Sequence, residues 1–233
     1  MIKHYYWPTP NGHKTAIMLE EVELEYELYP IDILNGAQFA PEFIKISPNN
    51  RIPAILDTDG PEGKPYAVFE SGAILLYLAE KTGKLWPGDM KSRYDVMQWL
   101  MFQMGNVGPM FGQNGYFQGY CPEDVPLARE RYHKVTKQIY SVLDKRLGES
   151  AYLAGDNYSI ADVATYPWTV PKQQTMHKIN ADEYPNVKRW GKEIAARPAV
   201  QRGVAILEDD LKVGDPTEET YKNMFGSGQF ERK

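Results

Sequence analysis

In the first third of the chain, short apolar runs, which are typical of strands, alternate with segments whose apolar residues recur at helical spacing. The predicted elements are strand Lys3–Trp7, helix Lys14–Glu23, strand Tyr26–Ile33, helix Pro41–Ser47, strand Ala54–Leu56, strand Tyr66–Phe69 and a helix that opens at Glu70-Ser71-Gly72. Their order, β-α-β-α-β-β-α, predicts a small α/β domain over residues 1–83. Its first two strands are expected to pair in parallel through a right-handed crossover.

The rest of the chain shows almost no strand pattern, so an all-helical domain is expected over residues 92–213, after a linker at 84–91 that contains Pro87-Gly88. Tyr94–Gln103 is apolar nearly all round, which indicates a helix that is buried on most sides or lies in a subunit interface. The polar tail, residues 214–233, is expected to be disordered or to fold back over the cleft that holds the candidate site.

Further helical patterns fill this second domain. They are Leu127–Leu147, which is long and charged, Pro185–Ala196 and Ala199–Leu207. Ser159-Ile160-Ala161-Asp162 has the spacing of a capping box and opens another apolar helix. We interpret this box as structural, because its side chains are expected to bond to the backbone at the start of the helix.

Composition narrows the class of protein. The 233 residues are 42% apolar, and the charge of 26 − 31 = −5 argues weakly against nucleic acid or an anionic membrane as the main partner. No apolar run approaches the ~18 residues of a membrane span, and the N-terminus lacks the apolar core of a signal peptide. A single cysteine, Cys121, excludes an internal disulfide framework, so a cytoplasmic, reducing location is expected.

The stretch Tyr6–Gly12 is the first candidate for chemistry, because it joins the first strand to the first helix. Its prolines fix φ, and we expect Gly12 to give the turn its freedom. Asn11-Gly12 is an N-cap signature, so Thr9 and Asn11 are presented at a helix N-terminus, which favours negative charge. A redox protein with this opening would carry C-x-x-C here. Since this chain has no cysteine nearby, we hypothesise that the site handles a thiolate that arrives with a bound small molecule.

The loop Ser47–Pro53 is rich in turn residues and ends on Ile52-Pro53, directly before an apolar strand. A proline that opens a strand cannot donate to the ladder. An X-Pro bond is cis in about 5% of cases, and the sequence leaves both isomers open.

These motifs carry a family resemblance. The stretches P-T-P-N-G-H, S-P-N-N-R-I-P and F-E-S-G-A-I-L-L-Y-L-A resemble the thioredoxin-like domain of glutathione transferases. They are most similar to the Nu-class branch, the bacterial relatives of the yeast nitrogen-regulating prion protein, which have disulfide-bond reductase activity. The resemblance runs from about Met1 to about Val204. It implies a thioredoxin-like domain followed by a helical glutathione-transferase domain, in a homodimer.

The resemblance implies glutathione as co-substrate, as two molecules or one glutathione disulfide per site. Glutathione carries two carboxylates, one amine and one thiol. The helix N-terminus with Ser71 suits the γ-glutamyl carboxylate, and Glu70 beside it suits the amine. Ile52, held before Pro53, can offer its backbone N–H and C=O to the cysteinyl unit, as an added strand would.

The other implied contacts lie at the ends of the ligand. Gln38 and Arg51 can reach the glycyl end, and Arg131 matches a position that contacts a second glutathione in similar proteins. Thr9 and Asn11 are the implied activators of the thiol. Lowering a thiol pKa by about two units corresponds to roughly 2.7 kcal/mol, which hydrogen bonds to a charged group, worth about 1.5–3 kcal/mol each, can supply.

Several plainer interpretations stay open from the sequence. Asn11 could serve only as a helix cap and Thr9 only as a turn residue, while Tyr6, or Tyr5 beside it, could donate to the thiolate in their place. Arg131 could be an ordinary solvated charge. Cys121 is interpreted as incidental, and the four histidines have no metal-ligand spacing, so no metal is expected.

The favoured function is a glutathione-dependent disulfide-bond reductase. One glutathione thiolate attacks a small disulfide, and a second releases glutathione disulfide. Conjugation of glutathione to electrophiles and reduction of organic peroxides are alternatives that use the same thiolate. A regulator that holds glutathione without turnover is an alternative of another class.

Overall fold

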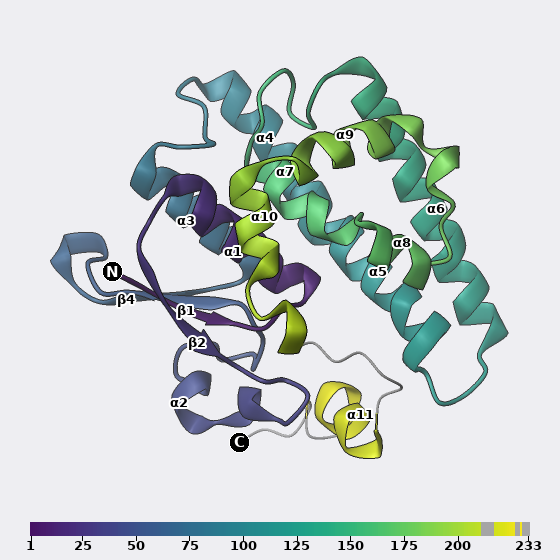
Figure 1. Ribbon diagram of the computed structural model, residues 1–233, viewed down its shortest axis with the longest axis horizontal. Coiled ribbons are helices and arrows are strands. Elements are labelled where there is room, and N and C mark those ends of the chain that lie inside the picture. Colours follow the sequence, from purple (N-terminus) through teal and green to yellow (C-terminus); the bar gives the residue numbers. More distant parts are fainter. Residues whose placement is uncertain (211–216, 227–228, 230–233) are drawn as a thin grey trace. The chain divides into compact units, whose positions relative to one another are not determined.

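The computed structural model describes residues 1–210, 217–226 and 229, and these residues form two compact units (Figure 1). The first unit contains Met1–Tyr77 together with the described residues from Arg202 onward, and the second contains Leu78–Gln201. Residues 211–213 of the predicted helical domain, and residues 214–216, 227–228 and 230–233 of the predicted tail, lie outside the described residues.

The first unit is built on a four-stranded mixed sheet. Its strands are β1 (Ile2–Tyr6), β2 (Tyr26–Pro30), β3 (Ala54–Asp57) and β4 (Tyr66–Phe69). They lie in the order β2-β1-β3-β4, with β1 parallel to β2 and β3 antiparallel to both of its neighbours. The thioredoxin-like architecture expected from the sequence is therefore confirmed.

Three helices accompany this sheet. They are α1 (Pro10–Val22), α2 (Pro41–Ile44) and α3 (Ser71–Thr82), with short 3-10 turns at Ala37–Phe39 and Pro61–Gly63. In Figure 1, α1 and α3 lie on one side of the sheet and α2 on the other. The buried side of β1 alternates as a strand requires, since Ile2, His4 and Tyr6 point inward. The core beneath α1 is formed by Ala16, Ile17, Met18 and Leu19 with Ala54, Ile55, Ile74 and Leu75, all fully buried.

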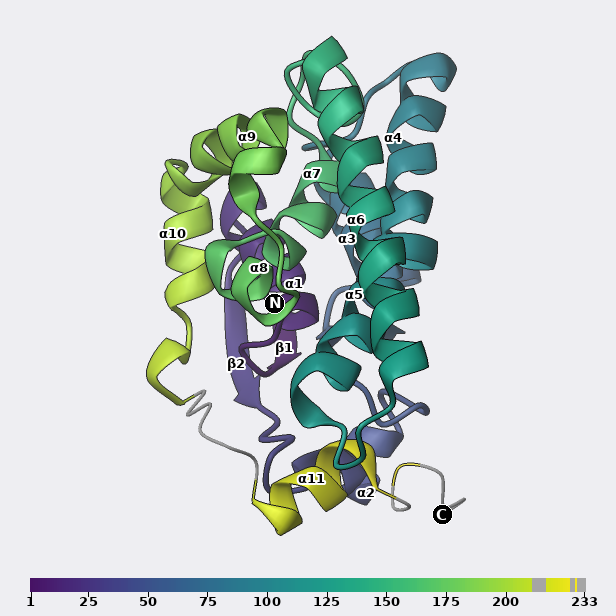
Figure 2. The same cartoon turned by 90° about the vertical axis from the view of Figure 1, so that its right-hand side faces the viewer.

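The chain returns to this unit at its C-terminal end. From Arg202 onward, α10 (Pro198–Ala205) packs on α1, where Arg202 Nε lies 2.6 Å from Glu20 Oε2. A further helix, α11 (Glu218–Phe225), is capped by Thr217 and bonds to the loop after β2, because Asn223 Nδ2 donates to Leu34 O at 2.9 Å. Figure 2 shows α11 in yellow beside that loop. The sequence did not predict this helix.

The second unit is helical, as expected. Its helices are α4 (Met90–Phe102), α5 (Gly108–Gly115), α6 (Pro126–Glu149), α7 (Ile160–Thr165), α8 (Pro171–Met176) and α9 (Pro185–Ala195), with π-helical turns at Gln103–Val107 and Tyr116–Tyr120 and 3-10 turns at Tyr166–Trp168 and Ala181–Glu183. α4 leads into α5 through the π-helical turn at Gln103–Val107. Within the described ranges, no helix has the length and apolar character that crossing a membrane requires.

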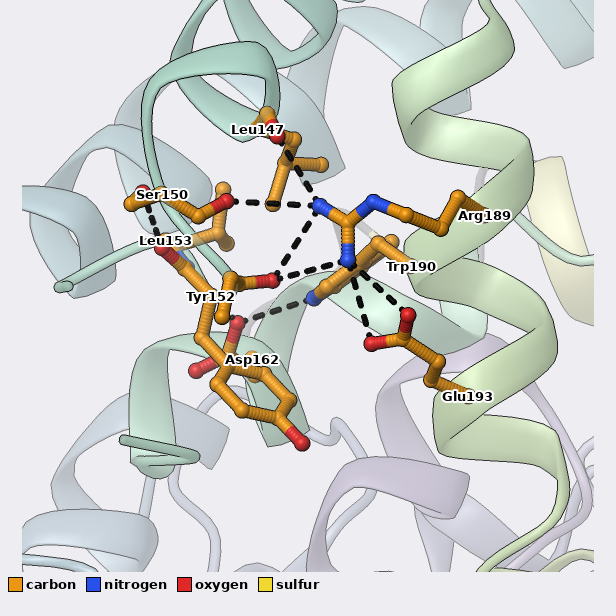
Figure 3. A network of polar contacts seen from close by, with 9 residues as sticks. Leu147, Ser150, Tyr152, Leu153, Asp162, Arg189, Trp190 and Glu193 are labelled. Atoms are coloured by element: carbon orange, nitrogen blue, oxygen red, sulfur yellow. Dashed lines mark hydrogen bonds and ion pairs between the residues drawn. The ribbon is translucent and has the colours of Figure 1, made fainter. Parts of the chain in front are cut away.

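The predicted capping box is present at the start of α7. Asp162 Oδ2 accepts from Ser159 N at 3.0 Å, and Ser159 Oγ accepts from Ala161 N at 3.3 Å. Asp162 Oδ1 also accepts from Leu153 N and from Trp190 Nε1, both at 2.9 Å. Figure 3 shows this carboxylate tying α7 to α9. Burial raises the pKa of Asp162 to about 6, while its donors favour the charged form.

Arg189 extends this network to the end of α6. Its guanidinium donates to the backbone oxygens of Leu147, Ser150 and Ala151, and it also pairs with Glu193 (Figure 3). The Leu147 carbonyl is among those that a helix leaves without an internal partner at its C-terminal end, and Ser150 is the C-cap of α6. The network therefore has a structural explanation, as the sequence indicated for the capping box.

Candidate functional site

The turn between β1 and α1 is shaped by a helix cap. Thr9 has extended backbone angles, and its Oγ1 accepts from Gly12 N at 3.2 Å, so Thr9 is the N-cap of α1. Pro10 follows as the first helical residue, a position where its missing N–H costs no hydrogen bond. The prediction of a cap at Asn11-Gly12 was therefore wrong. Asn11 is the second residue of α1 and is half-buried.

Gly12 is required for a different reason from the one expected. A Cβ at this position would lie 2.0 Å from Trp7 O and 3.0 Å from a ring carbon of Tyr6. The close approach of two backbone segments, and not a left-handed conformation, therefore excludes a side chain here. The turn is held in one conformation against the end of β1.

Thr9 can serve two purposes with one hydroxyl group. A hydroxyl has one donor hydrogen and two acceptor lone pairs. The cap uses a lone pair, so the hydrogen of Thr9 can still be directed at an anion near the helix N-terminus. That end of α1 carries partial positive charge from its backbone N–H groups, which adds to the attraction.

The rival donor, Tyr6, is already engaged. Its ring is fully buried, and its hydroxyl donates to Ile206 O at 3.1 Å. Burial raises the pKa of Tyr6 well above its ordinary value. Tyr5 points to the other side of β1, where its ring packs against Tyr29 and Phe43. The geometry thus favours Thr9 over either tyrosine as a donor at this turn.

The loop before β3 presents a piece of unpaired backbone. The Ile52-Pro53 bond is cis, and Pro53 is buried. Ser47 Oγ braces the loop by donating to Arg51 O at 2.8 Å and accepting from Arg51 N at 3.3 Å. Within the described part of the chain, the backbone N–H and C=O of Ile52 form no hydrogen bond. An extended ligand could pair with both groups.

The start of α3 combines strain with a buried hydroxyl. Glu70 is exposed and has a φ of 69°, in the left-handed region, which costs a non-glycine residue about 1 kcal/mol or more. Ser71, the first residue of α3, is only 5% exposed. Strain of this kind at a helix start is consistent with a ligand site, because it fixes an acidic side chain beside the helix N-terminus.

Gln38, the residue predicted at the glycyl end of the ligand, has hydrogen-bond partners within the protein. It is buried, and its Nε2 donates to Ile33 O at 3.3 Å and to Asn223 O on α11 at 3.0 Å. Its Oε1 is buried and has no partner. Because both amide hydrogens are engaged, Gln38 would have to release one of them before it could donate to a glycyl carboxylate. Arg51 is exposed.

The first unit thus contains all the predicted ligand residues except one. Arg131 belongs to the second unit, where it is exposed on α6. One residue that the sequence analysis missed also points to this site: Lys14 of α1 is buried, and its Nζ donates to Ser71 Oγ at 3.3 Å. Lys14 lies three residues before Ile17 and four residues before Met18, on the apolar face of α1. This spacing could have predicted its burial from the sequence.

Two other predictions concern residues outside this group. Cys121 is half-buried and follows the π-helical turn Tyr116–Tyr120. Among the residues that the structure describes, no group of three or more His, Cys, Asp or Glu side chains could hold a metal ion.

Comparison with known proteins agrees with this arrangement. The model of the glutathione S-transferase N-terminal domain matches residues 1–80, and that of the C-terminal domain matches residues 118–198. The disulfide-bond oxidoreductase YfcG of Escherichia coli K12 is 50% identical over 214 residues, which cover 91% of this chain and 97% of that protein. The chain belongs to the glutathione S-transferase family.

Solved structures of this family are similar to the protein over most of its length. A family member from Pseudomonas fluorescens, solved with two glutathione bound, is 46% identical, with a TM-score of 0.84 over 87% of this chain and 92% of that one. A glutathione transferase from Pseudomonas putida, solved with one glutathione disulfide per subunit, is 45% identical, with a TM-score of 0.84 over 88% and 91%. The fold expected from the resemblance is therefore confirmed.

Proposed function

We propose that this protein is a glutathione-dependent disulfide-bond reductase. The observation that carries the proposal is the Thr9 cap, which leaves a hydroxyl hydrogen available at the positive end of α1, where no cysteine is present. The 50% identity with a disulfide-bond oxidoreductase supports this reaction, and the relatives solved with two glutathione or with glutathione disulfide support its co-substrate.

The first step is activation of the bound thiol. A free thiol has a pKa near 8.5, so only a few per cent is thiolate at neutral pH. A hydrogen bond from Thr9 and one from the Asn11 amide, together with the field of α1, stabilise the charged form and lower that pKa. Neither residue gains or loses a proton in this step.

The exchange then takes two attacks. The thiolate attacks one sulfur of a small disulfide, forms a mixed disulfide and expels the other half as a thiolate. A second glutathione thiolate attacks the glutathione sulfur of the mixed disulfide. Two glutathione molecules are oxidised to glutathione disulfide, and the substrate disulfide is reduced to two thiols. We assign Arg131 to the second glutathione.

The remaining residues hold the ligand. In this proposal Ser71 receives the γ-glutamyl carboxylate, and Glu70 receives the amine. The unpaired backbone of Ile52, directly before Pro53, pairs with the cysteinyl unit. Arg51, and Gln38 once one of its amide hydrogens is released, serve the glycyl end.

The oligomeric state, the cellular location and the partners of the protein belong to the same proposal. We propose a homodimer in the reducing cytoplasm, with no nucleic acid or membrane partner. The chain's negative charge and its single cysteine agree with this setting.

Steady-state assays with one preparation separate the possible activities. Reduction of hydroxyethyl disulfide by glutathione, followed by coupled reduction of the glutathione disulfide formed, tests the proposal. Conjugation of an aromatic chloride tests the transferase alternative, reduction of cumene hydroperoxide tests the peroxidase alternative, and calorimetry with glutathione tests binding without turnover. The proposal is wrong if glutathione binds and the disulfide is not reduced.

The activation step has its own test. We expect the double variant Thr9→Ala with Asn11→Ala to lose disulfide reduction by at least tenfold, because each lost hydrogen bond to a thiolate is worth about 1.5–3 kcal/mol. Unchanged reduction by the double variant would refute thiol activation by these two residues.

A further inference from the structure

Lys14 is a fully buried lysine. It is 1% exposed on α1, among core residues that include Ala16, Ile17 and Met18. Lysine is almost never buried to this extent without a charged or polar partner, because removing an ammonium from water is costly. Burial lowers the pKa of Lys14 to about 7, and the charge of Glu70 partly offsets this effect. The disulfide exchange proposed above makes no use of this residue.

The ammonium of Lys14 lies behind the start of α3. Its Nζ donates to Ser71 Oγ at 3.3 Å, across 57 residues of sequence. When the serine oxygen accepts from an ammonium, its own O–H becomes a better donor, because the two bonds polarise one another. An anion that receives the Ser71 hydroxyl and the N–H groups of α3 therefore also favours the protonated, cationic form of Lys14 behind that hydroxyl.

A basic and an acidic side chain lie near Ser71. Lys14, which is cationic when protonated, is buried and bonded to Ser71, while the acidic Glu70 is exposed, one residue before Ser71. The γ-glutamyl group of glutathione carries a carboxylate and an ammonium on the same carbon. It therefore matches this pair, with its carboxylate toward Ser71 and Lys14 and its ammonium toward Glu70.

We propose that Lys14 is a positioning residue for the γ-glutamyl carboxylate of glutathione: its ammonium acts through Ser71 and supplies the positive charge that this carboxylate neutralises. The proposal rests on the proposed function, because it assumes that glutathione binds at Ser71. It assigns a role in ligand selection to a residue inside the protein core.

A comparison of two ligands isolates this interaction. The probes are S-methylglutathione, which removes thiol ionisation from the measurement, and the same tripeptide with 4-aminobutyrate in place of glutamate, which lacks only the α-carboxylate. Binding of both to the full-length protein is measured by calorimetry for the wild type, Lys14→Met and Lys45→Met. Lys45 is an exposed lysine at the C-cap of α2, in the same unit, and serves as the matched control.

We expect Lys14→Met to bind S-methylglutathione about 30-fold or more weakly than the wild type, since removing one partner of a buried charge pair has effects of this size. Binding of the analogue should change less than threefold, and Lys45→Met should change neither. Equal weakening of both ligands by Lys14→Met would show that Lys14 only shapes the fold and would overturn the proposal. A wild type that binds neither ligand would overturn the proposed function as well.

A second measurement needs only the folded wild-type protein, so it decides the matter even where Lys14→Met does not fold. A carboxylate bound beside Ser71 raises the pKa of Lys14, so binding of S-methylglutathione at pH 7.5 should take up a fraction of a proton. Calorimetry in buffers of different ionisation enthalpy measures this uptake. Binding of the analogue should show much less.

A further variant tests whether another titratable group near Lys14 takes up the proton. Glu70 faces Lys14 from the start of α3, His13 precedes it on α1, and His4 of β1 bonds to the adjacent Thr15. On α3, Tyr77 is bonded to Asp57. Uptake that persists in His13→Asn supports Lys14 as its source. Equal uptake with both ligands, or uptake that is lost in His13→Asn, would refute the assignment.

Discussion

Thr9 combines a structural and a chemical task at the scale of one residue. Its oxygen accepts the Gly12 N–H and caps α1, while its hydrogen is the proposed donor to the thiolate. Replacing Thr9 by alanine removes both at once, so activity and stability fall together and the two tasks stay mixed. Substitutions that keep one task and remove the other are more informative.

Three substitutions of Thr9 separate these tasks. Thr9→Ser should keep both stability and disulfide reduction within about threefold. Thr9→Asp keeps a good cap, so the free energy of unfolding should be retained, yet its negative charge opposes a thiolate and activity should fall about tenfold or more. Thr9→Ala should lose about 1 kcal/mol of stability as well as activity. Urea unfolding and steady-state rates measure these effects, and an active Thr9→Asp would contradict the proposed role.

His4 predicts a pH dependence of stability. It is fully buried on β1, its Nε2 lies 2.7 Å from Thr15 Oγ1, and Thr15 donates its hydrogen to Gly12 O. Nε2 must therefore carry the proton of the neutral ring. Burial lowers the pKa of His4 from 6.5 to about 3. Below pH 6.5 the unfolded state binds a proton that the folded state does not, so stability is lost as pH falls.

The size of this effect follows from the two pKa values. At pH 5 the contribution of His4 to the free energy of unfolding should be about 2 kcal/mol smaller than at pH 7.5. His4→Gln keeps an N–H donor without the titration, so the difference in stability between wild type and variant should change by that amount between these pH values. Urea titrations at both pH values measure it. A constant difference would show that His4 does not titrate in this way.

At the scale of elements, the placement of α1 depends on a glycine far away in sequence. A Cβ on Gly203 of α10 would lie 2.8 Å from both the N and the Cα of Ile17. These are backbone atoms of α1, so they cannot turn aside as a flexible side chain could. Because α1 carries Asn11 and Lys14 and is capped by Thr9, the contact with α10 helps to fix the candidate site.

Gly203→Ala should therefore destabilise the protein by about 1–3 kcal/mol, as overpacking does, and should raise the KM for glutathione. Gly191→Ala is the matched control, since Gly191 is also helical and has no atom within 4 Å of an added Cβ. That change should leave KM unaltered and stabilise the protein by about 0.5–1 kcal/mol. Equal effects of the two substitutions in thermal unfolding and kinetics would argue against a packing role for Gly203.

At the scale of the whole molecule, the surface of α4 supports the proposed homodimer. Met90, Tyr94 and Met101 form one stripe along this helix and are 75%, 60% and 47% exposed in the single chain. A stripe of large apolar side chains on a surface commonly marks a protein interface. The apolar sequence of Tyr94–Gln103 was compatible with burial within the chain or with a subunit interface. The buried Val96 and Leu100 explain only part of this apolar character.

The corresponding test is a change of oligomeric state. We expect the wild type to show twice the monomer mass in light scattering after size exclusion, and the double variant Tyr94→Glu with Met101→Glu to show the monomer mass. Leu127→Glu is the control, because Leu127 is 80% exposed on α6, away from this stripe in sequence. A wild-type monomer, or a dimer that survives the double substitution, would refute this interface.

The sequence by itself determined the order of the elements, the turn residues and the capping box, because each depends on contacts within a few residues. It did not place the cap of α1 correctly, since Thr9 and Asn11 are both good capping residues and in the folded chain Thr9 is the one that accepts from Gly12 N. Nor did it predict α11, whose contact with Leu34 spans 189 residues.

Tertiary structure decided which polar groups are available. Tyr6 is engaged by Ile206, Gln38 is engaged by Asn223, and Lys14 meets Ser71 inside the core. Hydrogen bonds and charges act over a few ångströms, and these partners come from segments that are distant in sequence. The pattern of residues therefore specified the family and the candidate ligand, while the folded chain specified which donors and charges that ligand can meet.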